Sequence, residues 1–272
     1  MKPKNTLYIM SDEHNPTMMG CYGHEIVQTP NIDKLAARGT RFTAHYTNSP
    51  ICIPARAAFA TGRYTHETKY WDNATAYDGA VKGWGHRLQE EGISVESIGK
   101  LHYRNEELPT GFSKQYLPMH VMDGIGQVWG SIREPLPKER PSKMLNKIGP
   151  GTSNYNRYDM QIADQACSWL KDAAEQKTKK PDIEKPWVLY VGFVAPHFPF
   201  VVPEQFYNLY PLRDLPPRKL DPETGYQRHP WIQRMDDFQQ TDRNLTPEQR
   251  LQCVAAYYGL CTFVDFQIGR VL

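Results

Sequence analysis

Apolar residues gather in two continuous runs that lie far apart along the chain. Residues 5–11 form the first run, which has a polar end, and residues 187–194 form the clearer second one. Short continuous apolar runs are typical of strands buried on both faces of a sheet. Residues 93–98 follow a helical stretch and predict a third strand. Together with the helical patterns between them, these runs predict an α/β fold with a largely parallel sheet flanked by helices.

Helical signals occupy the stretches between and after the strands. Thr246, Pro247 and Gln249 fit a capping box that opens the last helix. One stretch has a single apolar face, formed by Ile162, Ala166, Trp169, Leu170 and Ala173. The predicted helices run from Pro30 to Gly39, over 83–91 with Gly92 as the cap, over 156–175, and from Thr246 toward Leu272.

The remaining segments have weaker patterns. Residues 41–46 alternate and predict a strand or an extended segment, in which His45 has a structural role. Residues 105–155 have no sustained period, so we expect a long surface excursion that contributes to a substrate lid. We expect residues 177–185 to be a solvated linker, and residues 200–245, which are rich in proline, to be irregular.

Composition limits the class of protein. The 272 residues are 40% hydrophobic and 23% charged, which suits one large or two small globular domains with a substantial core. The net charge of +2 creates no global field that would recruit nucleic acid or a membrane surface. No signal peptide and no run of membrane-spanning length are visible. The five cysteines show no metal-binding spacing, which favours reduced thiols and a cytoplasmic location.

The segment around Cys52 is the strongest candidate for chemistry. Pro54 can open a short helix that Gly62 ends, which places Cys52 at a helix N-terminus. Free N–H groups and the helix dipole favour negative charge there, and Arg56 lies one turn further on. This combination suits a tetrahedral oxyanion such as sulfate or phosphate. Taken alone, however, a cysteine in an apolar loop is more often a small buried hydrophobic residue.

A family resemblance changes that interpretation. Cys52-x-Pro54-x-Arg56, followed by Thr61-Gly62-Arg63, resembles the signature of the type I sulfatases. The resemblance implies an alkaline-phosphatase-like fold and a Cys52 that a formylglycine-generating enzyme oxidises to Cα-formylglycine. The hydrated aldehyde is the nucleophile in that family, and a plain thiolate nucleophile is disfavoured in this sequence context.

Acidic residues directly follow the first predicted strand. In open α/β sheets ligands bind beyond the carboxyl ends of strands, where carboxylates are candidate ligands for a hard cation. An isolated Asp-Glu pair is by itself more often a solvated loop. The resemblance implies that Asp12 binds the metal, whereas Glu13 is a weaker candidate because many members have a second Asp there. The implied cation is Ca²⁺, with Mn²⁺ or Mg²⁺ as alternatives.

Basic residues follow the other two predicted strands. Lys100 and His102 are two residues apart in an extended segment, so they can face one site as a fixed charge and a proton carrier. Alone, such a pair is a weak signal. The resemblance places both in the active site, and implies that His197, held between two prolines, contacts the scissile ester. Asn73 is predicted either to donate to a bound sulfate or formylglycine hydrate, or to form an Asx-turn.

The resemblance covers nearly the whole chain but only the N-terminal part of a family member. Sulfatases continue with a strand ending in Asp-His or Asp-Asn, which completes the metal site, and with a Lys that contacts the sulfate. None of these is present in the 272 residues. We therefore expect residues 1–272 to be an incomplete sulfatase N-terminal catalytic domain, either a fragment or a truncated product with weakened metal binding.

The sequence thus predicts hydrolysis of a small-molecule sulfate monoester through formylglycine and a divalent cation. Two alternatives stay open. Phosphonate monoester and phosphodiester hydrolases share the same motif, and a pseudoenzyme or non-catalytic fragment would use the fold for binding alone. Neither the alcohol part of the ester nor the oligomeric state, including a homo-oligomer, follows from the sequence.

Overall fold

The computed structural model describes residues 4–126, 134–135, 145–179, 186–217, 219–221, 224–239 and 245–272. Its centre is a parallel sheet with the strand order β1-β5-β2-β3. The strands are β1 (Thr6–Asp12), β5 (Trp187–Pro196), β2 (Ser94–Lys100) and β3 (Lys114–Met119). The predicted α/β fold and its three strands are confirmed. β3 lies inside residues 105–155, which were predicted to be a surface excursion. No strand was predicted there because the mixed sequence of β3 has no strand period.

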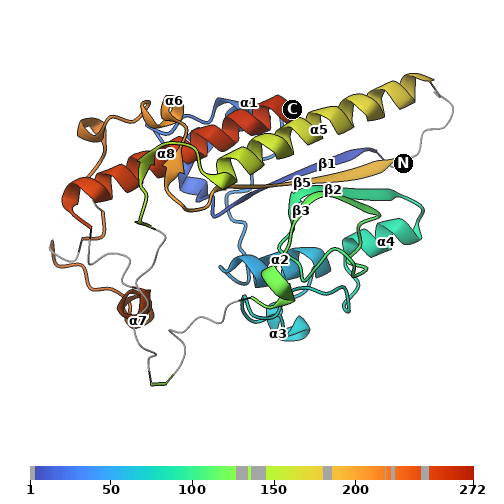
Figure 1. Ribbon diagram of the computed structural model, residues 1–272, viewed down its shortest axis with the longest axis horizontal. Coiled ribbons are helices and arrows are strands. Elements are labelled where there is room, and N and C mark those ends of the chain that lie inside the picture. The colour runs from blue at the N-terminus through green and yellow to red at the C-terminus, as the bar shows by residue number, and fades with distance from the viewer. Residues whose placement is uncertain are drawn as a thin grey trace.

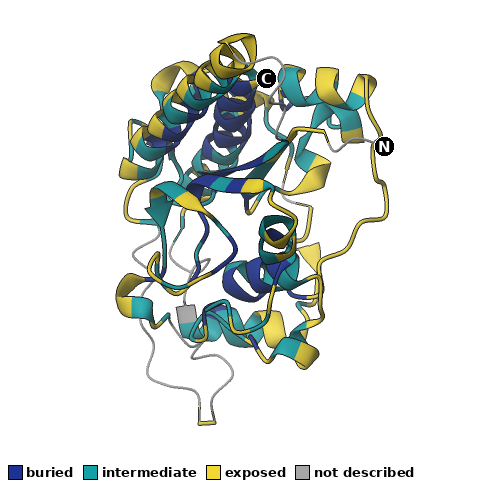
Figure 2. Cartoon of the chain, turned by 90° about the vertical axis from the view of Figure 1, so that its right-hand side faces the viewer, coloured by how far each residue is buried: buried dark blue, intermediate teal, exposed yellow. Residues whose placement is uncertain are grey.

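Helices cover both faces of this sheet (Figure 1). The long helices α5 (Asn154–Lys179) and α8 (Pro247–Val271) lie side by side on one face, together with α1 (Pro30–Ala37). The other face carries α2 (Cys52–Thr61), α3 (Thr65–Thr68) and α4 (Trp84–Glu90). β5 is buried along nearly its whole length because it lies in the middle of the sheet, under both layers (Figure 2).

The two long helices begin at reciprocal caps. At α8, the Gln249 N–H donates to Thr246 Oγ1 (3.1 Å) and the Thr246 N–H donates to Gln249 Oε1 (2.9 Å), which confirms the predicted capping box. At α5, Ser153 Oγ accepts from the Asn156 N–H (3.1 Å) while Asn156 Oδ1 accepts from the Ser153 N–H (2.7 Å). α5 runs on into the predicted linker, whose residues 180–185 lie outside the described residues.

Other expectations need correction. Residues 41–46 are exposed and form no strand, since Phe42 and Tyr46 pack into no core. Residues 200–245 are not wholly irregular, and short elements occur there because local caps and turns need no long period. The further elements are β4 (Gly149–Pro150), β6 (Val201–Val202), α6 (Glu204–Tyr207), α7 (Pro230–Gln239) and the 3₁₀ turns η1 (Pro16–Met18), η2 (Gly20–Tyr22), η3 (Met122–Gly124) and η6 (Leu212–Asp214).

Two general features follow from the described part of the chain. All five cysteines are described, and each is a free thiol. Within the described ranges no helix is long and apolar enough to span a membrane.

Candidate functional site

The predicted site residues converge where three strands end against the first turn of α2. Asp12 ends β1, Lys100 ends β2, and His197 directly follows β5. Asp12, Cys52 and His197 each present a potential ligand atom, and these atoms all lie within 4.8 Å of one another. The carboxyl edge of the sheet therefore gathers these side chains as the sequence predicted, although their chemical roles stay predictions.

Cys52 opens α2 itself, which corrects the predicted start at Pro54. Ile51 is extended (φ −111°, ψ 139°) and serves as the N-cap, and its carbonyl accepts from the Ala55 N–H (3.0 Å). Pro54 lies in the first turn, where its missing N–H group removes no hydrogen bond, because the first four N–H groups of a helix have no intrahelical partner. Gly62 ends the helix in the left-handed region (φ 65°), as predicted.

The Cys52 side chain is half-buried and protonated. Burial and the nearby Asp12 carboxylate raise the pKa of its thiol, and together they outweigh Lys100 and Arg56. The helix N-terminus therefore does not produce a thiolate here. This environment disfavours an unmodified cysteine nucleophile.

Asp12 is held between two cations. The buried Arg56 guanidinium places Nη2 3.6 Å from Asp12 Oδ1, and the Lys100 ammonium forms an ion pair with Oδ2. Burial alone would raise the pKa of Asp12, but Arg56 and Lys100 outweigh it and bring the value to about 2. Asp12 is therefore ionised at all physiological pH values.

Tyr190 and a backbone carbonyl fix the orientation of Arg56. Arg56 Nη1 donates to the Lys100 carbonyl (2.8 Å) and to the Tyr190 hydroxyl (2.9 Å). Arg56 Nη2 is buried, and no described residue offers it a hydrogen bond. One edge of the guanidinium is thus anchored by hydrogen bonds, while Nη2 on the other edge faces the Asp12 carboxylate at 3.6 Å.

His197 adopts a defined tautomer. Its Nδ1 lies 2.6 Å from the Phe198 carbonyl, which can only accept, so Nδ1 carries a proton. Its Nε2 lies 3.4 Å from Glu13 Oε1. Burial and Lys100 lower the pKa of His197 to about 4, whereas burial and Asp12 raise the pKa of Glu13 to about 7. The neutral ring therefore presents Nε2 to the site.

His102 reaches the site by a different route from the one predicted. β2 ends at Lys100, and His102 has a positive φ of 57°, so strand alternation does not place the two side chains together. The His102 N–H donates to the Met119 carbonyl (2.8 Å), and its buried Nδ1 has no partner among the described residues. Burial and Lys100 lower the pKa of His102 to about 3, so the ring is neutral at physiological pH.

Asn73 contacts the start of α2. Its Oδ1 accepts from the Ile53 N–H (3.1 Å), and its Nδ2 lies 3.9 Å from Cys52 Sγ. The Asx-turn considered for Asn73 belongs instead to Asp72, whose Oδ1 accepts from the Ala74 N–H (2.8 Å). Asn73 thus points its amide donor at the candidate nucleophile.

Sequence reasoning missed three residues of the site. Tyr190 anchors Arg56, Tyr155 places its ring edge-on to His197 with centroids 5.9 Å apart, and Asp159 bonds the backbone just before His197. Asp159 had a usable signal, because it lies three residues before Ile162 on the apolar helix face. Nothing in the sequence marked either tyrosine.

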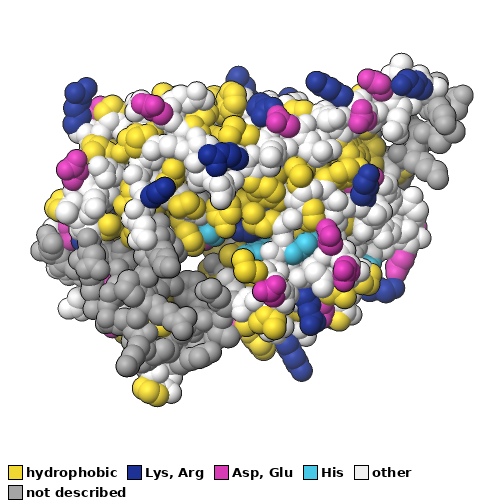
Figure 3. Space-filling model, viewed as in Figure 1, with side chains coloured by type: hydrophobic (Ala, Val, Ile, Leu, Met, Phe, Trp, Pro, Cys, Tyr) yellow, Lys and Arg dark blue, Asp and Glu magenta, His cyan; other side chains and the backbone are white. Residues whose placement is uncertain are grey.

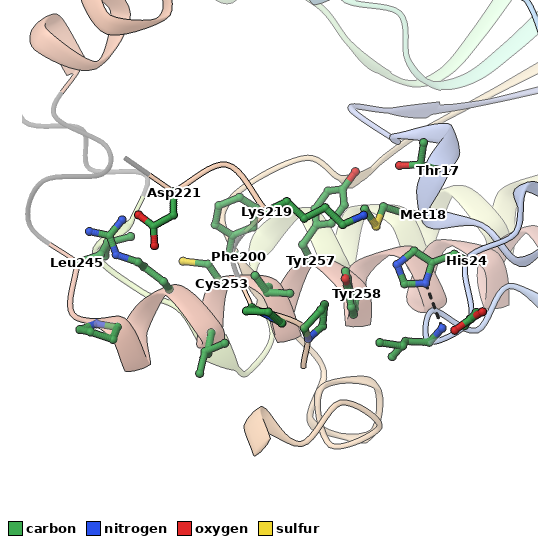
Figure 4. Close-up of a pocket in the computed structure, with 18 of the residues that line it drawn as sticks. Thr17, Met18, His24, Phe200, Lys219, Asp221, Leu245, Cys253, Tyr257 and Tyr258 are labelled. Carbon is green, nitrogen blue, oxygen red and sulfur yellow. Dashed lines mark hydrogen bonds between the residues drawn. The ribbon is translucent and has the colours of Figure 1, made fainter. Parts of the chain in front are cut away.

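A large cavity lies beside the loop that follows β1. Histidine side chains reach the surface along the hollow between the two helical layers (Figure 3). A cavity of about 1310 Å³ has Tyr257 and Tyr258 of α8 and Phe200 among its lining (Figure 4). None of Asp12, Cys52 and His197 lines it. The Tyr257 hydroxyl donates to the Glu13 carbonyl (2.8 Å), so the cavity wall is bonded to the loop that follows β1.

Comparison with known proteins gives consistent results. A family model described as Sulfatase matches residues 4–272. The chain is 28% identical over 286 residues to a choline-sulfatase of Rhizobium meliloti (strain 1021), covering 98% of this chain and 53% of that protein. It is 26% identical to arylsulfatase K of Bos taurus, covering 98% and 48%. The structure of a phosphonate monoester hydrolase of Agrobacterium radiobacter superposes with a TM-score of 0.72 at 22% identity, covering 99% and 58%, which is a likeness of fold. The chain spans about half the length of the curated relatives.

Proposed function

The chain belongs to the sulfatase family, whose members are hydrolases acting on ester bonds, and on this basis we propose that it cleaves a small-molecule sulfate monoester. The nucleophile is formylglycine derived from Cys52. One observation carries the proposal: Cys52, at the head of α2 in the family signature, shares a cluster with Asp12 and His197. Because the chain spans about half of its curated relatives, the activity of the whole protein is part of the proposal.

The donor atoms present suit a hard divalent cation. Asp12 is an ionised carboxylate, and the oxygen that replaces the Cys52 sulfur would supply a second oxygen ligand. Glu13, which lies outside the cluster of Asp12, Cys52 and His197, is the weaker candidate. This set favours Ca²⁺ over softer metals, with Mn²⁺ or Mg²⁺ as alternatives, although Ca²⁺ takes six to eight oxygens in all. When bound, such a cation makes the formylglycine hydrate a better nucleophile and neutralises charge on the ester.

The remaining side chains of the site have different proposed roles toward the ester. Arg56 would supply a fixed positive charge beside Asp12, and Lys100, at the end of β2, would hold a sulfate oxygen. His197 either binds a sulfate oxygen or protonates the leaving alcohol, and both roles require Nε2 to take up a proton first. The Glu13 carboxyl, whose Oε1 lies 3.4 Å from Nε2 and whose pKa is raised to about 7, can supply that proton. His102, neutral and buried, accepts a proton from the residue at position 52. Asn73 donates its amide to the hydrate or the sulfate.

Mass spectrometry of the tryptic peptide Phe42 to Arg56, from protein made in its native host, tests the proposal. We expect the mass of an aldehyde or its hydrate at Cys52, while the peptide containing Cys167 keeps an ordinary thiol. An unmodified Cys52, in a host that matures other sulfatases, would contradict the proposal and favour a pseudoenzyme. Cys52→Ala should abolish turnover.

The charges of the site do not by themselves separate sulfate from phosphonate esters, because both present tetrahedral oxyanions to Arg56 and Lys100. Relative rates on an aryl sulfate and an aryl phosphonate monoester separate these two activities. The proposal further includes a formylglycine-generating enzyme as partner and a cytoplasmic location. Secretion of the mature protein by its native host would contradict the latter.

A further inference from the structure

A buried carboxylate on α5 lies beneath the end of β5 that leads to His197. Asp159 is 0% exposed, and its oxygens accept hydrogen bonds from the N–H groups of Val194 (2.7 Å) and Ala195 (2.8 Å). These N–H groups lie beyond Gly192, where β5 last pairs with β2 and its register with β1 begins to shift. Buried N–H groups need a partner, and Asp159 supplies it where the sheet no longer can.

The same strand end connects Asp159 to His197. The Val194 carbonyl accepts a hydrogen bond from the His197 N–H (3.0 Å), so Val194 is bonded to Asp159 on one side and to His197 on the other. Tyr155, one turn earlier on α5, meets the His197 ring edge-on at an interplanar angle of 87°. Residues four apart share a helix face, so this face of α5 contacts the His197 ring through Tyr155 and is linked to the His197 backbone through Asp159 and Val194.

The first turn of α5 is itself fixed in place. The reciprocal bonds between Ser153 and Asn156 close this turn, and Asn156 is only 1% exposed. A helix start that is both capped and buried cannot tilt without breaking these bonds. The contacts that Tyr155 and Asp159 make are therefore held by a rigid element rather than by a loop.

We propose that the start of α5 is the positioning element of His197, with Asp159 setting the backbone path after β5 and Tyr155 setting the tilt of the imidazole ring. The inference rests on the role proposed above for His197 at the ester. Nδ1 is committed to the Phe198 carbonyl, so the direction of Nε2 depends on where the backbone leaves the strand. The Asp159 carboxyl group presents one oxygen to each of the two adjacent N–H groups. Asparagine offers one acceptor and turns its own donor toward the other N–H group.

Asp265 provides a matched control. It is 1% exposed and accepts from two backbone N–H groups, those of Asn31 (3.1 Å) and Ile32 (2.8 Å), at the start of α1. Asp265 also accepts from the Asn31 side-chain amide through Oδ2 (2.8 Å). Asp265→Asn and Asp159→Asn therefore each replace one accepting carboxyl oxygen with a donor at a buried site, and only Asp159 adjoins His197. Both variants should lose folding stability. Only Asp159→Asn should disturb His197.

The first measurement is NMR of protein labelled with ¹³C at histidine Cε1, with the His197 signal assigned by its loss in His197→Gln. We expect Asp159→Asn to move or broaden this signal and Asp265→Asn to leave it unchanged. An unchanged His197 signal in folded Asp159→Asn overturns the proposal. If Asp159→Asn does not fold, Tyr155→Leu decides in the same way, because it removes the ring contact and leaves the carboxylate in place.

Kinetics of the matured protein add a second readout. In Asp159→Asn we expect kcat to fall roughly 10–100-fold with KM little changed, as small misplacements of a reacting group do. In the case where His197 protonates the leaving alcohol, esters of weakly acidic alcohols should lose more than nitrophenyl esters, because they depend more on that proton. A shifted His197 signal in a protein that turns over no ester would uphold the positioning and refute the proposed function.

Discussion

Replacing Tyr190 with phenylalanine removes a single oxygen from beneath Arg56. The side chain is 2% exposed, its hydroxyl accepts from Arg56 Nη1 (2.9 Å), and it lies 3.2 Å from the Lys100 carbonyl. The ring itself keeps its place among aromatic neighbours, including Tyr8, which stacks at 5.8 Å. The substitution therefore isolates the hydrogen bonds from the packing.

The expected cost follows from what Arg56 keeps. A hydrogen bond to a charged group contributes about 1.5–3 kcal/mol, but Arg56 Nη1 retains the Lys100 carbonyl at 2.8 Å. We therefore expect Tyr190→Phe to lower the free energy of unfolding by about 1–2 kcal/mol, a factor of about 5–30 in the folded-to-unfolded ratio. Urea denaturation measures this as a lower midpoint at an unchanged slope.

Tyr22→Phe is the matched control. The Tyr22 hydroxyl donates to the Phe42 carbonyl (2.8 Å), but the side chain is 38% exposed, so water can replace the lost bond. We expect Tyr22→Phe to change the free energy of unfolding by no more than about 0.5 kcal/mol. If Tyr190→Phe costs no more than Tyr22→Phe, then Tyr190 does not anchor Arg56 and the argument is wrong.

Three further predictions concern charge and packing at the site. Asp12→Asn leaves Lys100 and Arg56 buried without their counter-charge, so the free energy of unfolding measured with urea should fall by about 3–5 kcal/mol. It should also remove any rise in Tm on adding Ca²⁺, and an undiminished rise would argue against Asp12 as a ligand. Gly192→Ala places a Cβ against the Lys100 carbonyl, so we expect a loss of about 1–3 kcal/mol by the same assay, and a wild-type midpoint would contradict the close approach. Burial raises the pKa of Asp159 to about 7, so its contribution to stability is complete below about pH 4 and is lost as the pH rises toward 7. The difference in unfolding free energy between wild type and Asp159→Asn should fall over that range by up to about 1.4 kcal/mol per pH unit. A difference that does not change with pH would refute the raised pKa of Asp159.

Hydrophobic pattern was enough to predict the sheet and its main helices, because burial on both faces leaves a strong local signal. That the residues after β1, β2 and β5 share one site was implied by the family resemblance and not by the pattern, and the structure brings Asp12 and His197 together. The pattern could not predict β3, whose mixed polar and apolar sequence forms a strand by pairing with β2. It could not show that β2 ends before His102, because a single positive φ is set by tertiary contacts rather than by residue type.

The supporting residues of the site were harder to predict than its chemical groups. Asp159 stood on an apolar helix face, and a carboxylate there calls for a partner, but the partner is a pair of N–H groups on β5 that only the folded chain brings near. In the sequence, nothing distinguishes Tyr190 from the other large residues of a buried strand. Its hydroxyl becomes informative only when Arg56 is seen to reach it from α2.

The strand order has a consequence for the timing of synthesis. β5 lies between β1 and β2 in the sheet, yet it is made after both of them, so the sheet cannot close until the ribosome has passed Pro196. The Cys52 segment leaves the ribosome long before that point. At about 5–20 residues per second the delay is on the order of ten seconds. During this interval nothing from β5 covers the cysteine, and a maturation enzyme would find it in an open chain.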